Sequence, residues 1–370
     1  MHYTQHRFDR TSNQDFYKTL KQRIDNYFEE NGISKKGGRK MVIKTIAMVL
    51  IFGIPYALMI SGLVTATLPF IGLWFLMGVG IAGIGSSVMH DANHGSYSSN
   101  NRVNRIMSFS MDLVGGNALI WRLQHNVLHH TYTNIQGADE DIDGPPVLRF
   151  SPNQEHKFIH RFQHIHAWLF YPLMSFVKVI YTDFEQAFHY RKIGLIKSQS
   201  ELIKALLNIA FGKMVYIGYM LLIPMLLLPV SPWIIIAGFL VMHGVTGLSL
   251  AIVFQSAHVM PDSEFPMPET NGDMQNDWAL HQLLTTTNFA PKNKWLSWFI
   301  GGLNFQVEHH LFSNISHVHY PQISKIVKET ALEFKLPYRS RNTFREAIAD
   351  HARMLYILSK PPETVKVVNH

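Results

Sequence analysis

The chain has no cysteine among its 370 residues. Without thiols it can form neither a disulfide framework nor a metal site with thiolate ligands. Long parts of the chain also have no charge: Asp, Glu, Lys and Arg are absent from 45–89 and from 214–257. Residues 1–40 contain no apolar segment of the kind that forms a secretory signal. Membrane insertion is therefore expected to depend on the uncharged segments themselves.

Each uncharged segment is too long for one membrane-spanning helix. A bilayer core of about 30 Å is crossed by roughly 20 residues, so each segment fits two helices joined by a turn. Turn-forming residues stand at the expected joints, TATLP at 65–69 and PVSPW at 229–233. We therefore predict two transmembrane hairpins, 43–64 with 68–89 and 212–229 with 233–255.

Basic residues flank the predicted spans on one side of the membrane only. Neither hairpin turn carries Lys or Arg, and cations near spans are retained on the cytoplasmic side. Both termini, the middle of the chain and nearly all histidines are thus expected in the cytoplasm, at a bacterial inner membrane. The flanking cations are Lys35, Lys36, Arg39, Lys40 and Lys44 at the first span, and Lys204 and Lys213 at the third.

Histidines cluster just outside the predicted spans. His90 and His94, like His125 and His129, are spaced i, i+4. On a helix such a pair shares one face, with Cβ atoms about 5–6 Å apart, and can reach one metal ion. His130 is turned by about 100° from His129, so adjacent histidines are expected to serve different ions. The remaining candidates are the doublet His309 and His310, and His258 at the end of the fourth predicted span.

Eight histidines exceed the four ligands that one structural ion usually takes, so they predict two metal ions. The chain has no HExxH motif and no cysteine, which disfavours zinc hydrolases and deaminases. Imidazole suits iron, copper, nickel and zinc. A pocket among membrane helices must accept hydrocarbon, and breaking an unactivated C–H bond requires an O2-derived metal oxidant, which favours iron.

The expected fold class is all-α and integral-membrane, with four transmembrane helices in two hairpins and a cytoplasmic helical cap that holds the metal site. Segment 12–31 predicts an amphipathic helix that lies on the membrane surface or packs on this cap. Segments 104–121 and 167–181 are interpreted as interfacial. The expected divisions are 1–40 (N-terminal cytoplasmic segment), 41–340 (main domain) and 341–370 (C-terminal helix and tail).

Two further motifs are discounted. Residues 78–83 satisfy G-x-G-x-x-G, but they lie inside a predicted span, where glycines allow close helix packing. Residues 139–144 begin like a calcium loop, yet Phe150 stands where the bidentate Glu is required. That acidic run is either a solvated loop or support for a nearby cationic site.

The motifs HDANH (90–94), HNVLHH (125–130) and QVEHH (306–310) resemble the three histidine boxes of membrane fatty acid desaturases, with similarity over roughly 40–340. Gln306 resembles the front-end branch of that family, and we expect it to contribute to cofactor binding. Asp91, Asn126 and Glu308 are candidates for supporting the ligands. The resemblance implies these iron ligands: His90, His94, His125, His129, His130, His258, His309 and His310.

The resemblance implies an O2-dependent oxidoreductase with two non-haem Fe ions that introduces a cis double bond into a fatty acyl substrate. The acyl carrier can be CoA, a carrier protein or a membrane lipid. No HPGG-type haem motif occurs in the chain, so electrons are expected from a separate ferredoxin or cytochrome b5. A di-iron hydroxylase or carotenoid oxygenase and a metal-binding transporter stay open as alternatives. No nucleic-acid partner is expected.

Overall fold

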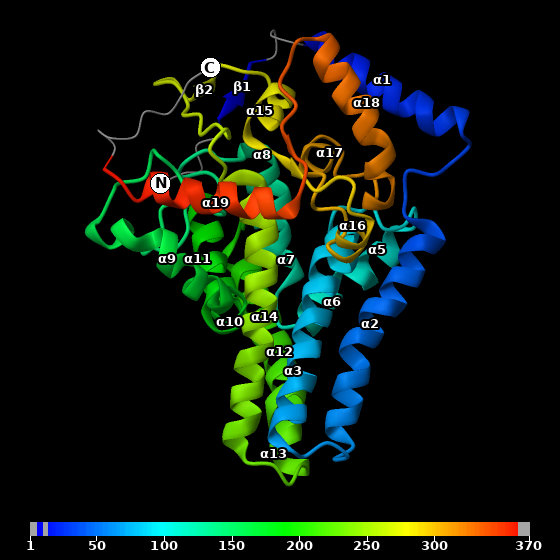
Figure 1. Ribbon diagram of the computed structural model, residues 1–370, viewed down its shortest axis with the longest axis vertical. Coiled ribbons are helices and arrows are strands. Elements are labelled where there is room, and N and C mark those ends of the chain that lie inside the picture. Colours follow the sequence, from blue (N-terminus) through cyan, green and yellow to red (C-terminus); the bar gives the residue numbers. More distant parts are fainter. Residues whose placement is uncertain (1–5, 10–13, 362–370) are drawn as a thin grey trace.

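The computed structural model describes residues 6–9 and 14–361. Four long helices extend from one end of the molecule, and shorter helices form a cap at the other end (Figure 1). All four are long and apolar enough to cross a bilayer. Their bounds are Gly38–Ile60, Thr67–Asn93, Gln199–Leu227 and Pro232–His258.

These helices form the two predicted hairpins. The third begins at Gln199, well before the predicted 212. The uncharged segment covers only the part of the helix that fits inside the bilayer. The helix itself begins earlier and also includes Glu201 and Lys204. The first span is α2 (Gly38–Ile60) and the fourth is α14 (Pro232–His258); the second comprises α3 (Thr67–Gly83), η1 (Ile84–Met89) and α4 (His90–Asn93), and the third α12 (Gln199–Ile217), η6 (Gly218–Leu222) and α13 (Ile223–Leu227).

Glycines let α3 approach the helices on both sides of it. A Cβ on Gly78 would lie 2.5 Å from the Met242 carbonyl oxygen of α14, and a Cβ on Gly80 would lie 2.7 Å from the Phe52 nitrogen of α2. Any side chain at either position would force the helices apart. The G-x-G-x-x-G match thus belongs to helix packing, as expected.

Short, interrupted helices connect the second span to the third. Neither segment expected to be interfacial forms a long helix, and both expose large apolar side chains such as Ile106 and Leu169. Their interfacial placement stays a prediction. The connecting elements are α5 (Asn101–Ser108), α6 (Ser110–Leu113), α7 (Ala118–Trp121), η2 (Arg122–His129), α8 (His130–Tyr132), η3 (Phe158–Phe162), α9 (Gln163–Phe170), η4 (Tyr171–Leu173), α10 (Met174–Val177), η5 (Lys178–Thr182) and α11 (Asp183–Ile193).

The cap contains the N-terminal helix and the described residues after the fourth span, 259–361. Two short parallel strand pairs, β1 with β2 and β3 with β4, add to the predicted all-α architecture without changing its class. The cap elements are β1 (Arg7–Phe8), α1 (Gln14–Glu30), β2 (Asp273–Met274), α15 (Trp278–Thr285), β3 (Asn288–Phe289), α16 (Lys294–Phe299), α17 (Gln306–Leu311), η7 (His317–His319), α18 (Tyr320–Glu333), β4 (Ser340–Arg341) and α19 (Phe344–Leu358).

Helix α1 packs on the cap and not on the membrane surface. Its apolar stripe, Phe16, Leu20, Ile24 and Phe28, is at most 3% exposed. The stripe belongs to one buried cluster with side chains of α15, α17 and α18. The structure thereby decides between the two positions that the amphipathic pattern left open. Residues 12–13 of the predicted segment and the tail from 362 lie outside the described residues.

Candidate metal centre

The eight histidines predicted as ligands come together where the second and fourth spans enter the cap. All of them except the partly buried His94 are at most 7% exposed. Ring nitrogens from distant segments approach closely: His90 Nε2 lies 3.3 Å from His125 Nε2, and His130 Nε2 lies 3.0 Å from His309 Nε2. The four helices therefore bring all three boxes and His258 to one buried place.

The rings form two adjoining groups in which the potential ligand atoms lie within 4.8 Å of one another. The first group is His90, His94, His125 and His309, and the second is His129, His258 and His310. His130 stands between them, grouped with His309 and His310. His129 and His130 thus fall into different groups, whereas His309 and His310 share the group of His130. The arrangement offers places for two cations.

A π-helical segment sets the arrangement of the second box. In η2 the backbone bonds run from i to i+5, one residue longer than in an α-helix. His125 Nε2 consequently lies 3.2 Å from Nε2 of His130, five residues later. His125 also stays beside His129, as its i, i+4 spacing predicts, with the two ring centroids 5.1 Å apart.

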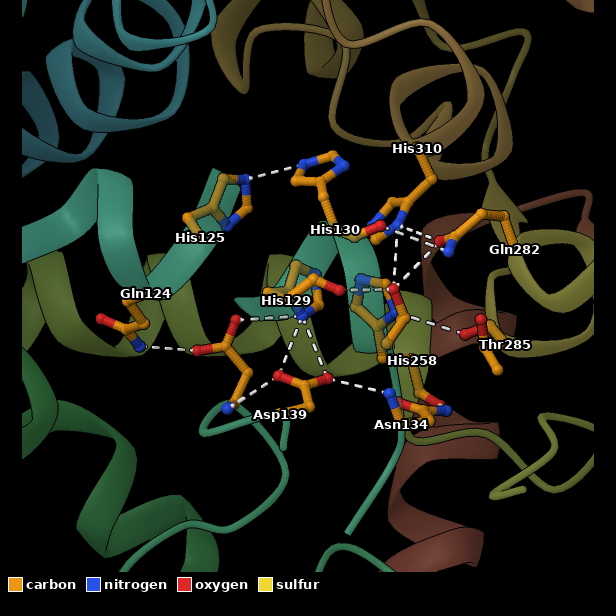
Figure 2. A network of polar contacts seen from close by, with 12 residues as sticks. Gln124, His125, His129, His130, Asn134, Asp139, His258, Gln282, Thr285 and His310 are labelled. Carbon is orange, nitrogen blue, oxygen red and sulfur yellow. Dashed lines mark hydrogen bonds and ion pairs between the residues drawn. The ribbon is translucent and has the colours of Figure 1, made fainter. Parts of the chain in front are cut away.

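In several of these rings Nδ1 forms a hydrogen bond to a neighbouring oxygen, and Nε2 points towards the centre (Figure 2). Nδ1 of His310 lies 2.8 Å from Gln282 Oε1, and Nδ1 of His258 donates to the Thr285 carbonyl. A neutral imidazole that donates through Nδ1 keeps a lone pair on Nε2, the form that binds metal. The residues therefore fit a metal cluster. Buried Nε2 atoms with no hydrogen-bond partner belong to His94, His129, His258 and His310.

The second group has the stronger electrostatic support. Nδ1 of His129 lies 3.1 Å from both carboxylate oxygens of Asp139 and 3.3 Å from Asp141. Although burial acts to lower it, the pKa of His129 is raised by these carboxylates. For the other candidate rings in the cap, burial first and then the neighbouring histidines lower the pKa well below its usual value, which favours the neutral form. They are His94, His125, His130, His309 and His310.

Comparisons with known proteins agree with this chemistry. The fatty acid desaturase family profile matches residues 65–342, which include all three boxes. The chain belongs to the fatty acid desaturase family. The sn-1 linoleoyl-lipid 6-desaturase of Synechocystis sp. is 37% identical, covering 96% of this chain and 99% of that protein. The acyl-lipid (8-3)-desaturase of Physcomitrium patens is 37% identical (92% of this chain, 70% of that protein), and that of Mortierella alpina 34% (94% and 78%).

This desaturase is therefore an oxidoreductase, with a metal site of the kind that its family uses. Gln306 begins the third box at the start of α17, one turn before His309 and His310. Its side chain is 1% exposed, and neither its Oε1 nor its Nε2 has a partner. A buried amide without partners is costly, which favours a role for Gln306 towards a bound ion, water or substrate.

The three candidate supporting residues differ in the structure. Asp91 accepts hydrogen bonds from Ser316 Oγ and His317 Nδ1, while His90 Nδ1 is 4.0 Å away. Asn126 donates to the Asn93 carbonyl. Glu308 binds Asn288 and Tyr338, and burial raises its pKa to about 7. Neither Asn126 nor Glu308 contacts a candidate ligand ring through these bonds. Both instead connect neighbouring segments of the chain around the site.

Sequence reasoning missed several residues that orient the ligands. Gln282 and Thr285 of α15 carry no recognisable motif, and only the fold brings them to His310 and His258. Asp139 belongs to the acidic run for which a supporting role was one of two alternatives, and the structure favours that role. Trp121 stacks on His125, with ring centroids 4.4 Å apart. Trp295 of α16 is 85% exposed.

Proposed function

We propose that this desaturase introduces a cis double bond into the acyl chain of a membrane glycerolipid, using O2 and two iron ions held by the eight histidines. The observation that carries the proposal is the convergence of Nε2 atoms from four separate segments on one buried place. Iron bound there would supply, with O2, the oxidising power needed to break unactivated C–H bonds. Gln306 is the proposed additional cofactor-binding residue.

The residues of the chain have distinct parts in this proposal. His90, His94, His125 and His309 would hold one ion, and His129, His258 and His310 the other, with His130 between them. Asp139, Gln282 and the Thr285 carbonyl keep the rings in the ligating tautomer. The surrounding burial excludes water, which protects a strong oxidant from side reactions.

The substrate class is inferred from the relatives. The Synechocystis protein is named for an sn-1 linoleoyl-lipid substrate, and it matches this chain over nearly its whole length. We infer an acyl-lipid substrate here, and a front-end position of the new double bond, between an existing double bond and the carboxyl end. The absence of Lys and Arg from both hairpin turns supports placing the cap in the cytoplasm, at a bacterial inner membrane.

Product analysis tests the proposal. The protein would be expressed in a host with defined fatty acids, and the total lipids would be profiled by gas chromatography and mass spectrometry. We expect one additional cis double bond, enriched in glycerolipids and not in the CoA or carrier-protein pools. An added hydroxyl group would identify a hydroxylase instead.

Variants connect the product to the centre. His129→Ala and His310→Ala should abolish the new double bond while leaving the protein in the membrane fraction, because each removes a ligand. His156→Ala is the matched control, since His156 contacts the Ser359 carbonyl outside the centre. Purified wild-type protein should contain about two irons per chain, a stoichiometry set by the two groups of ligands. Full activity in either ligand variant would remove that residue from the site.

A further inference from the structure

The proposed reaction consumes electrons that this chain cannot store in an iron–sulfur cluster of its own. Such clusters are held by cysteine thiolates, and the chain has no cysteine. Electrons from a separate carrier, the expected donor, would cross the protein between its surface and the buried histidines. A residue that both reaches the ligands and faces solvent would be the place of entry.

Helix α15 is one part of this wall. Its first residue, Trp278, is partly exposed, and its indole N–H donates to the His130 carbonyl oxygen at 3.1 Å. One turn later, Gln282 donates to the same carbonyl and also contacts His310 Nδ1. A continuous path of covalent and hydrogen bonds thus leads from the surface through Trp278 to the ring between the two groups.

Aromatic side chains cover this path on its outer side. The ring centroid of Tyr17 of α1 lies 5.7 Å from that of Trp278 and 6.1 Å from that of Phe312, two residues after the third box. Other aromatic side chains contact the ligands without offering the same access. Trp121 and Tyr320 are buried. Phe254 is partly buried, but it belongs to the fourth span and lies on the side of the centre that faces the membrane.

We propose that Trp278, together with Tyr17, is the entry point for electrons from a one-electron iron–sulfur or haem carrier protein that docks over α1 and α15. Two encounters deliver two electrons. With two protons, O2 and the two hydrogen atoms removed from the acyl chain, they yield one C=C bond and two water molecules. The inference rests on the proposed function, because it requires a redox centre at the histidines.

The position and charge of this surface fit such a partner. Figure 1 shows α1 and α15 at the end of the molecule remote from the hairpin turns, where a soluble protein can approach while lipid stays at the other end. Lys18 and Lys21 on α1 are exposed and form no ion pair within the described part of the chain. Both stand beside Tyr17 in the helix and favour acidic side chains on the carrier, although the exposed Asp15 of the same helix carries the opposite charge.

The test measures electron transfer separately from catalysis. Iron-loaded protein in nanodiscs would be mixed in stopped flow with reduced plant-type ferredoxin, or with the reduced haem domain of cytochrome b5, and carrier oxidation would be followed optically. Trp278→Leu should lose most of this oxidation rate, because the indole and its hydrogen bond to the His130 carbonyl are removed from the path. Its iron content and its reduction by dithionite, a small molecule, should stay unchanged.

Three variants make the result specific. Trp278→Phe keeps the ring and loses the N–H, so its rate should fall between those of Trp278→Leu and the wild type. Trp295→Leu removes an exposed tryptophan on α16 and should have no effect. With the iron-loaded protein and the carrier in its oxidised form, the pair Lys18→Glu and Lys21→Glu should weaken carrier binding, whereas Lys197→Glu, in the loop before α12, should not.

Each contrary result has a definite meaning. If Trp278→Leu oxidises the carrier at the wild-type rate, the inference of electron entry at Trp278 is wrong, and the proposed function is unaffected. An equal loss of the dithionite reaction would also overturn it, because the residue would then support only the structure of the centre. A wild-type protein that contains iron and oxidises neither carrier would overturn it as well. A wild-type protein that binds no redox metal would overturn the proposed function, and the inference with it.

Discussion

At the scale of single residues, hydrogen bonds to Nδ1 decide which ring nitrogen faces the centre. A neutral imidazole has one donor and one acceptor nitrogen. When Asp139, Gln282 or the Thr285 carbonyl accepts from Nδ1, the lone pair must reside on Nε2. Neighbouring backbone and side-chain oxygens therefore prepare the ligand set before any cation binds, and they reduce the cost of ordering the rings.

Asp139→Asn should weaken metal binding without unfolding the protein. The amide can still accept from His129 Nδ1, but it lacks the charge that favours a cation nearby, so we expect iron affinity to fall by about 10–100-fold. Retention of iron against increasing chelator concentration measures the change. Asp143→Asn is the control, because Asp143 accepts from the Gly137 amide and touches no ligand. Equal retention by wild type and Asp139→Asn would contradict the argument.

The residues of the site differ in how far the sequence can predict them. The histidines were predictable because doublets and i, i+4 spacing leave a local pattern. Gln282 and Thr285 leave none, since they reach the centre from a separate helix only after the cap has folded. Gln306 lies between these cases: its place in the third box identifies it, while its unpaired, buried amide becomes visible only in the structure.

At the scale of elements, composition predicts the spans and says little about their internal geometry. The uncharged segments placed both hairpins correctly. The π-helical turns η1 and η2 went unnoticed, because an extra residue in one turn does not change the apolar pattern. Those turns directly precede or contain the first two boxes, and they determine which histidines meet. The packing position of α1 was ambiguous for a related reason, because an apolar stripe can pack equally well against lipid and against protein.

Gly301→Ala should separate the third box from the second span. Gly301 has φ +63°, and a Cβ there would lie 2.2 Å from the Ser86 carbonyl oxygen. Left-handed backbone costs a side chain about 1–2 kcal/mol, and the clash should add about 1–3 kcal/mol. Thermal unfolding in detergent measures the sum. Gly272→Ala, with φ +86° and open space around it, carries only the first cost. Equal losses in the two variants would show that the close contact is unimportant.

Ile24→Ala tests the packing of α1 on the cap. Ile24 is 1% exposed within the cluster that includes α17 and α18. Its truncation should lower the free energy of unfolding by about 2–5 kcal/mol, as in other buried cores. The exposed Glu29→Ala on the same helix should change it little. Weaker membrane association with unchanged stability would instead place α1 on the bilayer.

At the scale of the whole molecule, the histidine centre is where spans and cap are joined. Its histidines come from the ends of the second and fourth spans, from the first connecting segment and from α17. Close burial of so many imidazoles is unfavourable when their lone pairs have no partner. Bound cations would satisfy these atoms and connect four parts of the chain, so metal binding and folding should be strongly coupled.

Metal removal should therefore lower the thermal stability of the entire protein. A cation that binds only the folded state adds about 2.7 kcal/mol when its free concentration is about a hundredfold above Kd. A membrane-permeant chelator should lower the unfolding midpoint, and returning Fe(II) should restore it. His310→Ala should begin at the lower midpoint and respond little to chelator, whereas His156→Ala should respond like the wild type. An unchanged midpoint after complete iron loss would mean that bound metal does not stabilise the fold and that the buried histidines need no cation.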